Sequence, residues 1–190
     1  RYHIIRSFGL PEGHCEHPED RVKILLWPHP KLAEISWSVV LPPDPAFLAE
    51  MFATMKAAGG IGLSAIQVGV TSTLFVTTAG GAQRVFVNPA WYVPPRVSEA
   101  AEKKGPMQEG CLSTPGQFAI VSRYPAVIVN YFDEKLEQQP PLLATGVLAH
   151  VVQHECEHLA GEMYVDHLKP ADRSRIMGAM MKLKRSGGRR

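Results

Sequence analysis

The stretch A-H-V-V-Q-H-E-C-E-H-L-A-G, residues 149–161, decides the fold predicted for this chain of 190 residues. It contains the pattern H-E-x-x-H, in which His154 and His158 are four positions apart. Side chains at that spacing lie on one face of an α-helix, so the two imidazoles can bind the same metal ion. Glu155 follows the first of them and can reach a water on that metal. The sequence therefore predicts a helix that carries a metal site.

The flanking residues also favour a helix. Apolar side chains recur at helical spacing at Val147, Leu148, Val151, Val152 and Leu159. Gly161 is typical of the position at which a helix ends, and Pro140 and Pro141 are typical of the segment that precedes one. The competing interpretation is a chance H-E-x-x-H on a solvated helix, because a five-residue pattern depends on its context.

The third metal ligand decides the class of enzyme, since tetrahedral catalytic sites use three protein ligands and one water. The extended pattern H-E-x-x-H-x-x-G-x-x-H is broken here, because Tyr164 occupies its final position. No Glu follows Glu162, which lies too close to serve as a downstream ligand. We therefore expect an upstream ligand, and Cys111 in Q-E-G-C-L-S-T-P-G is the natural candidate. Asp166, His167 and Asp172 stay open as alternatives. Cys156 points to another side of the helix than the two histidines, and we expect it to behave as a small buried apolar residue.

Three motifs together resemble those of the peptide deformylase family. They are G-I-G-L-S-A-I-Q at 60–67, E-G-C-L-S at 109–113 and Q-H-E-C-E-H-L at 153–159. Their order and separation suit the family, and the resemblance spans roughly residues 22–181. It implies an α+β fold in which antiparallel strands pack around a central metal-binding helix. The predicted series of strands before the site helix favours the same class.

The resemblance also implies a reaction. A metal-dependent hydrolase would remove the formyl group from the N-terminal formyl-methionine of new polypeptides and release formate. Cys111, His154 and His158 would hold one divalent ion, for which Fe(II) is expected and Zn(II) is the alternative, because thiolate and imidazole ligands suit both. Glu155 would act as the general base.

Two further groups would stabilise the oxyanion of that reaction, namely the Gln67 side chain and the backbone N–H of Leu112. The positions that match the family's pocket for the methionine side chain are Ile61, Gly62, Met107, Val147 and Val151. Each of these is explained equally well as ordinary core. Glu109 and Arg123 match an ion pair that supports the site in the family, and the alternative is two unrelated surface charges. Glu157 would orient one of the metal ligands without contacting the metal itself.

The chain departs from the family pattern at several positions. Glu157 replaces an Asp, Phe118 replaces a frequent Arg, and His150 replaces an Arg or an apolar residue. Ser64 and Ile66 replace the usual Ala and Pro beside Gln67. These departures leave the metal site and hydrolysis as predictions, but they put the substrate preference in question.

Two other functions stay open. One is a zinc peptidase, which the Tyr at position 164 and the missing downstream Glu disfavour. The other is a deformylase-like protein that binds metal with an altered substrate or without turnover. Glu155 and Gln67 argue against the second, because a structural metal site requires neither of them.

Composition is typical of a globular protein, with 45% hydrophobic and 20% charged residues. A net charge of +2 gives no reason to expect direct nucleic-acid binding, and no apolar run is long enough for a membrane span. Three cysteines without framework spacing favour a reducing compartment. We predict an N-terminal extension at 1–21, one catalytic domain at 22–184 and a basic tail at 185–190. The H-C-E-H cluster at 14–17 is expected to be surface rather than a metal site.

The predicted elements follow from periodicity and breakers. The chain should form strands at 22–27, 73–77, 84–87, 118–121 and 127–132. It should form helices at 46–58 and 171–183, a solvated charged loop at 96–106 and a disordered basic segment at 182–190.

Partners and location follow only from the resemblance. The expected partner is an N-formylmethionyl peptide, with the ribosome exit region as a further candidate. Formylated methionine implies bacterial-type translation. The N-terminal extension and the departures from the family slightly favour a mitochondrion as the expected location, and the bacterial cytoplasm is the alternative.

Overall fold

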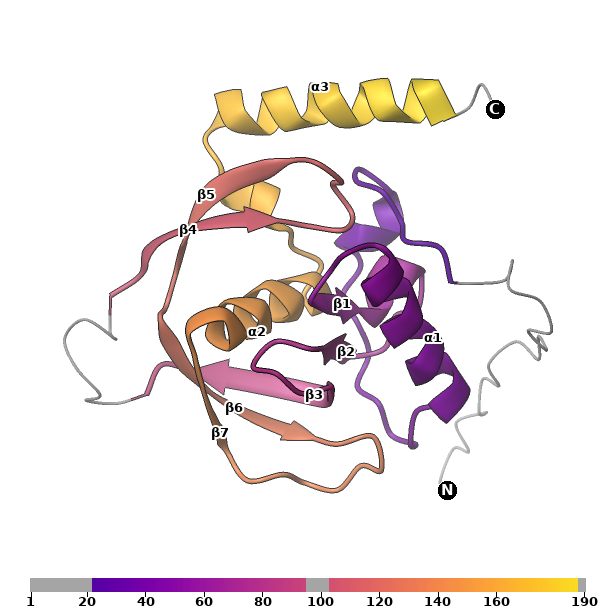
Figure 1. Cartoon of the computed structure of the whole chain (residues 1–190), viewed down its shortest axis with the longest axis vertical. Helices are drawn as coiled ribbons and strands as arrows, with labels where there is room; N and C mark the ends of the chain where they lie inside the picture. The colour runs from indigo at the N-terminus through magenta and orange to yellow at the C-terminus, as the bar shows by residue number, and fades with distance from the viewer. Residues whose placement is uncertain (1–21, 95–102, 188–190) are drawn as a thin grey trace, which may run out of the picture.

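The computed structural model describes residues 22–94 and 103–187. Figure 1 shows the helix α2 (Gly146–Leu159) at the centre, between a five-stranded sheet and a two-stranded hairpin. This arrangement is the predicted α+β fold with antiparallel strands around a central helix. Within the described residues, no helix combines the length and the apolar character that crossing a bilayer requires.

The five-stranded sheet is antiparallel throughout and has the order β1-β2-β3-β6-β7. Its strands are β1 (Gly62–Ser64), β2 (Leu74–Thr77), β3 (Arg84–Tyr92), β6 (Ala126–Phe132) and β7 (Leu142–Thr145). The register between β3 and β6 shifts between Val87 and Ala90. The hairpin consists of β4 (Gly105–Gly110) and β5 (Phe118–Arg123), which pair along their whole length.

One face of α2 packs on the five-stranded sheet. Its Leu148, Val151 and Val152 join Phe75, Phe86, Val127 and Val129 of the strands in one buried cluster. The opposite part of the helix presents His154, Glu155 and His158, which are buried as well. Because the apolar face fixes the rotation of the helix on the sheet, it also fixes where the polar pattern points.

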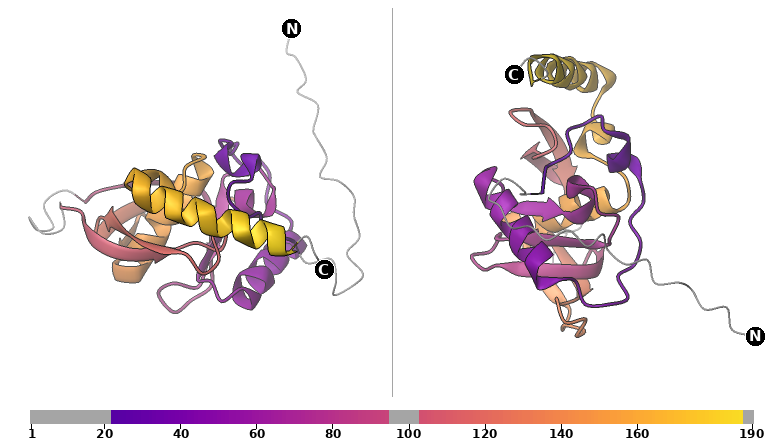
Figure 2. Two further views of the ribbon diagram at one scale, coloured as in Figure 1. Left: turned by 90° about the horizontal axis from the view of Figure 1, so that it is seen from above. Right: turned by 90° about the vertical axis from the view of Figure 1, so that its right-hand side faces the viewer.

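Two further clusters hold the remaining helices. The helix α1 (Pro45–Ala57) buries Met51 and Met55 against β1 and β2, so these methionines are core, as the sequence predicted. The helix α3 (Pro170–Gly187) buries Ile176 and Met180 near Val121 and Tyr164. Figure 2 shows α3 lying across the outside of the molecule, beside the hairpin side of the body.

The segment after α2 turns sharply before the short helix η3 (Tyr164–His167). Gly161 makes that turn with φ 78°. A Cβ at this position would lie 2.7 Å from the carbonyl oxygen of Ala33, and the positive φ would strain any L side chain. The predicted helix end at Gly161 is therefore confirmed.

Several predicted elements are wrong. Residues 22–27 form no strand, because Leu25 and Trp27 donate their backbone N–H groups to the separate carbonyls of Gln67 and Ser113 rather than to one strand edge. Gly105 and Pro106 begin β4 instead of ending a loop. The strand β7 was not predicted, since its four residues gain their pairing from β6. Residues 182–187 continue α3 and are not disordered.

The strand predicted at 84–87 continues through Asn88 and Pro89 to Tyr92 as β3, so its predicted end is wrong. The remaining strand and helix predictions agree with the structure to within a few residues. The helices predicted at 46–58 and 171–183 correspond to α1 and α3, which differ from them by a few residues at the ends. The predicted extension at 1–21, including the H-C-E-H cluster, lies outside the described residues. The division into one catalytic domain at 22–184 and a tail at 185–190 stays a prediction, although the end of α3 crosses that boundary.

Candidate metal centre

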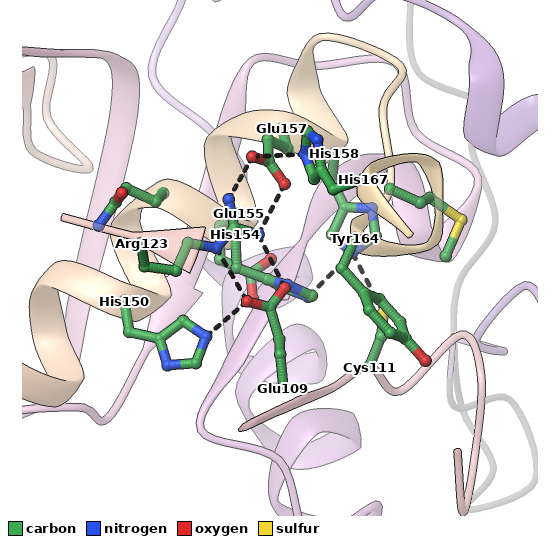
Figure 3. Close-up of polar contacts among 12 residues, drawn as sticks. Glu109, Cys111, Arg123, His150, His154, Glu155, Glu157, His158, Tyr164 and His167 are labelled. Carbon is green, nitrogen blue, oxygen red and sulfur yellow. Dashed lines mark hydrogen bonds and ion pairs between the residues drawn. The ribbon is translucent and has the colours of Figure 1, made fainter. Parts of the chain in front are cut away.

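Three side chains converge where α2 faces the end of β4. The Nε2 atoms of His154 and His158 lie 3.2 Å apart, and the Sγ of Cys111 lies 3.2 Å from Nε2 of His158. The ligand atoms of all three residues lie within 4.8 Å of one another. Figure 3 shows them together with the charged groups beside them. Among the described residues, this is the only such group of His, Cys, Asp or Glu.

The two imidazoles direct their Nε2 atoms at the same point, beside the sulfur of Cys111. Nδ1 of His154 donates a hydrogen bond to Glu109, so Nε2 is the ring nitrogen that faces Cys111 and His158. Burial lowers the pKa of His158 well below its ordinary value, which keeps that imidazole neutral. Burial alone would lower the pKa of His154, but its hydrogen bonds with Cys111 and Glu109 raise it well above its ordinary value. A metal ion at Nε2 would take the place of that proton. A cysteine sulfur and two imidazole nitrogens aimed at one point are a donor set that divalent ions such as Zn(II) and Fe(II) accept. The residues present therefore fit a metal.

Glu155 lies beside this group and is 3% exposed. Its Oε2 accepts a hydrogen bond of 2.6 Å from the hydroxyl of Ser64 on β1. Burial raises the pKa of Glu155, against the lowering effects of His154 and Ser64. Gly62 passes so close that a Cβ there would overlap the Glu155 carboxylate and the side chain of Val151. The site thus holds a carboxylate poised to accept a proton.

The Gln67 amide is held in one orientation from both ends. Its Oε1 accepts from the backbone N–H of Ser64 at 2.9 Å. Its Nε2 donates to the Ser113 hydroxyl at 3.2 Å and lies 3.3 Å from the Sγ of Cys111. Within the described part of the chain, the backbone N–H of Leu112 has no acceptor. Gln67 and Leu112 both line the same cavity as Cys111 and His154.

A buried network of charged side chains lies next to the three candidate metal ligands (Figure 3). Glu109 accepts two hydrogen bonds from Arg123 and one each from His150 and His154. Burial alone would raise the pKa of Glu109, but the hydrogen bonds from His150, His154 and Arg123 hold it well below its ordinary value. Arg123 also pairs with Glu157, which contacts His167. The charges of Glu109 and Arg123 are thus buried partners rather than unrelated surface groups.

A cavity of about 380 Å³ opens onto the metal-binding side chains. Its walls include Ile61, Gly62, Gln67, Leu112, Glu155 and Phe118. Of the other residues assigned to a methionine pocket, Val151 is buried beside Gly62, and Met107 lines a neighbouring cavity together with His150. Val147 is 55% exposed on α2 and lines neither cavity. The structure thus brings Ile61 and Gly62 to the main cavity and leaves Val147 apart from it.

The alternative ligands lie elsewhere. Asp166 pairs with Arg173 and caps the backbone of Met163. His167 contacts Glu157, and Cys156 packs against the core cluster formed by α2 and the sheet. Asp172 lies in the exposed first turn of α3. None of these four side chains reaches Cys111, His154 and His158.

Several residues that shape the site have no clear signal in the sequence. Tyr164 is fully buried, and its hydroxyl contacts Thr114 and the carbonyl of Gln117, so it supports the segment that carries Cys111. Ser113 was noted only as part of a motif, yet it positions Gln67. Their partners are distant in sequence, so no local pattern reveals them. Only the four-residue spacing of His150 and His154 was a usable signal.

Comparison with known proteins agrees with this geometry. A model of the family described as polypeptide deformylase matches residues 22–174. Peptide deformylase 2 of Xanthomonas campestris is 40% identical over 153 residues, which cover 77% of this chain and 84% of the relative. Peptide deformylase of Azotobacter vinelandii is 38% identical over 171 residues, which cover 87% of this chain and 97% of the relative.

The fold is similar to solved structures as well. The crystal structure of a peptide deformylase from Legionella pneumophila superposes with a TM-score of 0.79 at 34% sequence identity. The match covers 88% of this chain and 98% of the other. The similarity therefore extends over nearly the whole of the relative and includes the helix, hairpin and sheet described above.

Proposed function

The chain belongs to the polypeptide deformylase family, and from this premise we propose which of its residues carry the removal of N-formyl groups. The family's reaction is the hydrolysis of the formyl amide at the N-terminus of a polypeptide, and the chain is a metal-dependent hydrolase of this class. One observation carries the assignment: Cys111, His154 and His158 converge within 4.8 Å of one another. The family match supports this function over a zinc peptidase.

Cys111, His154 and His158 are proposed to hold one divalent ion, with Fe(II) expected and Zn(II) as the alternative. Bound there, such an ion supplies the electrostatic effect that lowers the pKa of a bound water from about 15.7 towards 7. The soft thiolate and the borderline imidazoles suit both ions, so the ligand types do not separate them. Glu109 accepts a hydrogen bond from Nδ1 of His154. This bond fixes the orientation of the imidazole, so that its Nε2 is directed at Cys111 and His158.

Glu155 is the proposed general base. It takes a proton from the attacking water, whose oxygen bonds to the formyl carbon. When the carbon–nitrogen bond breaks, Glu155 returns that proton to the leaving amine. The products are formate and a peptide with a free N-terminal methionine. The burial that raises the pKa of Glu155 favours both transfers, because it brings the carboxyl closer to the pH at which it must work.

Gln67 and the backbone N–H of Leu112 are the proposed donors to the developing oxyanion. Changing Gln67 to Glu keeps the oxygen that accepts from Ser64 but removes the NH2 donor. We expect kcat to fall about 10²–10³-fold, which is the usual effect of losing one such donor. Stopped formate assays at saturating substrate measure this change, with bound metal quantified in the same samples. An unchanged kcat in a fully metallated variant would remove Gln67 from the mechanism.

Phe118 is proposed to influence which peptides enter. It is 56% exposed at the edge of the main cavity, on β5 opposite Gly110. Changing Phe118 to Arg should raise kcat/KM for formyl-Met-Ala-Asp relative to formyl-Met-Ala-Phe by about 2–5-fold, as expected for an exposed charge pair. The measurement is a competition between the two peptides, followed by mass spectrometry.

Ile120 offers a matched control for Phe118. It lies two residues further on the same exposed face of β5, is 63% exposed and does not line the cavity. Changing Ile120 to Arg should leave the ratio for the two peptides unaltered. An equal shift in both variants would mean that the charge acts at long range and that Phe118 has no special place in peptide selection.

We also propose that five residues contact the methionine side chain of the substrate. Ile61, Gly62 and Val151 lie next to the main cavity, whereas Met107 and Val147 lie beyond it. A contact with the ribosome exit region is also retained as a proposal. The curated relatives compared above are bacterial, and they favour the bacterial cytoplasm over the mitochondrion as the location. The single catalytic domain at 22–184 is consistent with the span of the family match.

A further inference from the structure

The carboxylate of Glu109 is unusual in having all of its acceptor positions in use. Its side chain is 2% exposed. Oε1 accepts from Nη2 of Arg123 at 2.8 Å and from Nδ1 of His154. Oε2 accepts from Nε of Arg123 at 2.9 Å and from Nε2 of His150 at 2.6 Å. A carboxylate offers about four lone-pair sites, so these four N–H groups fix its position and its plane.

His150 reaches this carboxylate from the same helix as His154. The two residues are four apart on α2, and their side chains therefore lie on one face. The His150 side chain is 15% exposed, and Figure 3 shows its ring directed at Glu109. Since Glu109 accepts through both oxygens, His150 must carry its proton on Nε2. One carboxylate on β4 thus ties two successive turns of α2 to the hairpin.

Arg123 alone leaves the carboxylate incompletely held. Its two hydrogen bonds approach from one side, and Arg123 is shared with Glu157. The remaining two positions are occupied by His154, which is the group to be oriented, and by His150. Without His150, Oε2 would keep one donor, and the plane of the carboxylate could follow the movement of the Arg123–Glu157 pair.

We propose that His150 is a positioning residue for the metal centre, acting through Glu109 on His154. By fixing the second oxygen of Glu109, His150 keeps the first oxygen on Nδ1 of His154 and so keeps Nε2 of His154 directed at Cys111 and His158. This inference rests on the proposed metal site. It assigns no contact between His150 and the substrate or the metal.

The test compares the Zn(II) affinity of the unmodified full chain with that of variants at His150. Changing His150 to Leu removes the donor, and changing it to Gln replaces it with an N–H group of similar reach. We expect the Leu variant to bind Zn(II) about 10–100-fold more weakly, as is usual when a residue that supports a metal-binding His is lost. The Gln variant should bind close to the unmodified protein. Competition with a chromophoric chelator measures the affinity.

His167 offers a matched control, because it is another imidazole that contacts a carboxylate of the same network. It contacts Glu157 at 2.9 Å and is 42% exposed. Changing His167 to Leu should leave Zn(II) affinity close to that of the unmodified protein. Equal losses in the His150→Leu and His167→Leu variants would overturn the proposal, since they would indicate a general effect on the network.

A second comparison covers the case in which the Leu variant fails to fold. Changing His150 to Asn gives a polar side chain that is too short to reach Oε2, so the Asn and Gln variants differ in reach alone. The absorption bands of the Co(II)-loaded forms should match the unmodified protein for Gln and differ for Asn. Identical bands and affinities in both would overturn the proposal. None of these readouts depends on formate release, so a failure of the proposed reaction would be recognised separately.

Discussion

Changing Glu155 to Ala should lower formate release from a formyl-Met peptide by about 10²–10⁴-fold, which is the usual contribution of a positioned acid–base group. The carboxylate is buried and bonded to Ser64, and among the described residues that line the main cavity Glu155 is the only one with a carboxylate. The metal should stay bound, because Glu155 is not among the three proposed ligands. Stopped assays with metal quantified in each sample measure both quantities.

A more conservative variant separates the proton transfer from the shape of the site. Changing Glu155 to Gln keeps the volume and an acceptor for the Ser64 hydroxyl, yet it cannot take up a proton. It should be as inactive as the Ala variant. Substantial activity in a Gln variant with full metal content would contradict the assignment of Glu155 as the base.

Changing Cys111 to Ala should remove the metal itself. The thiolate is one of three proposed ligands, so its loss should weaken Zn(II) binding by more than the roughly 100-fold associated with residues that only support a ligand. Formate release should fall in parallel, because the remaining imidazoles of His154 and His158 cannot complete the site. Equilibrium dialysis against Zn(II), followed by elemental analysis, measures the loss.

Cys156 provides the matched control for that experiment. It is the other cysteine among the described residues, and it packs against the core cluster between α2 and the sheet. Burial raises the pKa of its thiol, which disfavours a thiolate there. Changing Cys156 to Ala should leave metal content and formate release unaltered.

Retention of metal by the Cys111→Ala variant would contradict the assignment of Cys111 as a ligand. It would point instead to a peptidase-type site with another third ligand.

The central helix and its metal-binding face could be predicted because their signals are local. Helical spacing of apolar residues set the buried face of α2, and the H-E-x-x-H pattern followed from the same periodicity. The two imidazoles meet as that spacing requires. The third ligand was less certain. Residue types favoured Cys111 but left Asp166, His167 and Asp172 open beside it, and the resemblance to the family then supported the cysteine.

The features that were missed depend on pairing between distant residues. The strand β7 is short and is defined by its hydrogen bonds to β6. Residues 22–27 have the composition of a strand, but they meet isolated carbonyl groups instead of a strand edge. The same limit applies to the site, where His150 and Glu109 are 41 residues apart in sequence. Such contacts have no periodic signature, so they became visible only in three dimensions.

The most direct test of the central claim is a product analysis with formyl-Met-Ala-Ser and protein loaded anaerobically with Fe(II). Our account predicts formate and intact Met-Ala-Ser in equal amounts, because hydroxide attack at the formyl carbon breaks only the formyl amide. Acetyl-Met-Ala-Ser serves as the control for the requirement for a formyl group. Cleavage of the Met–Ala bond, or no formate from protein with one metal ion per chain, would contradict the account.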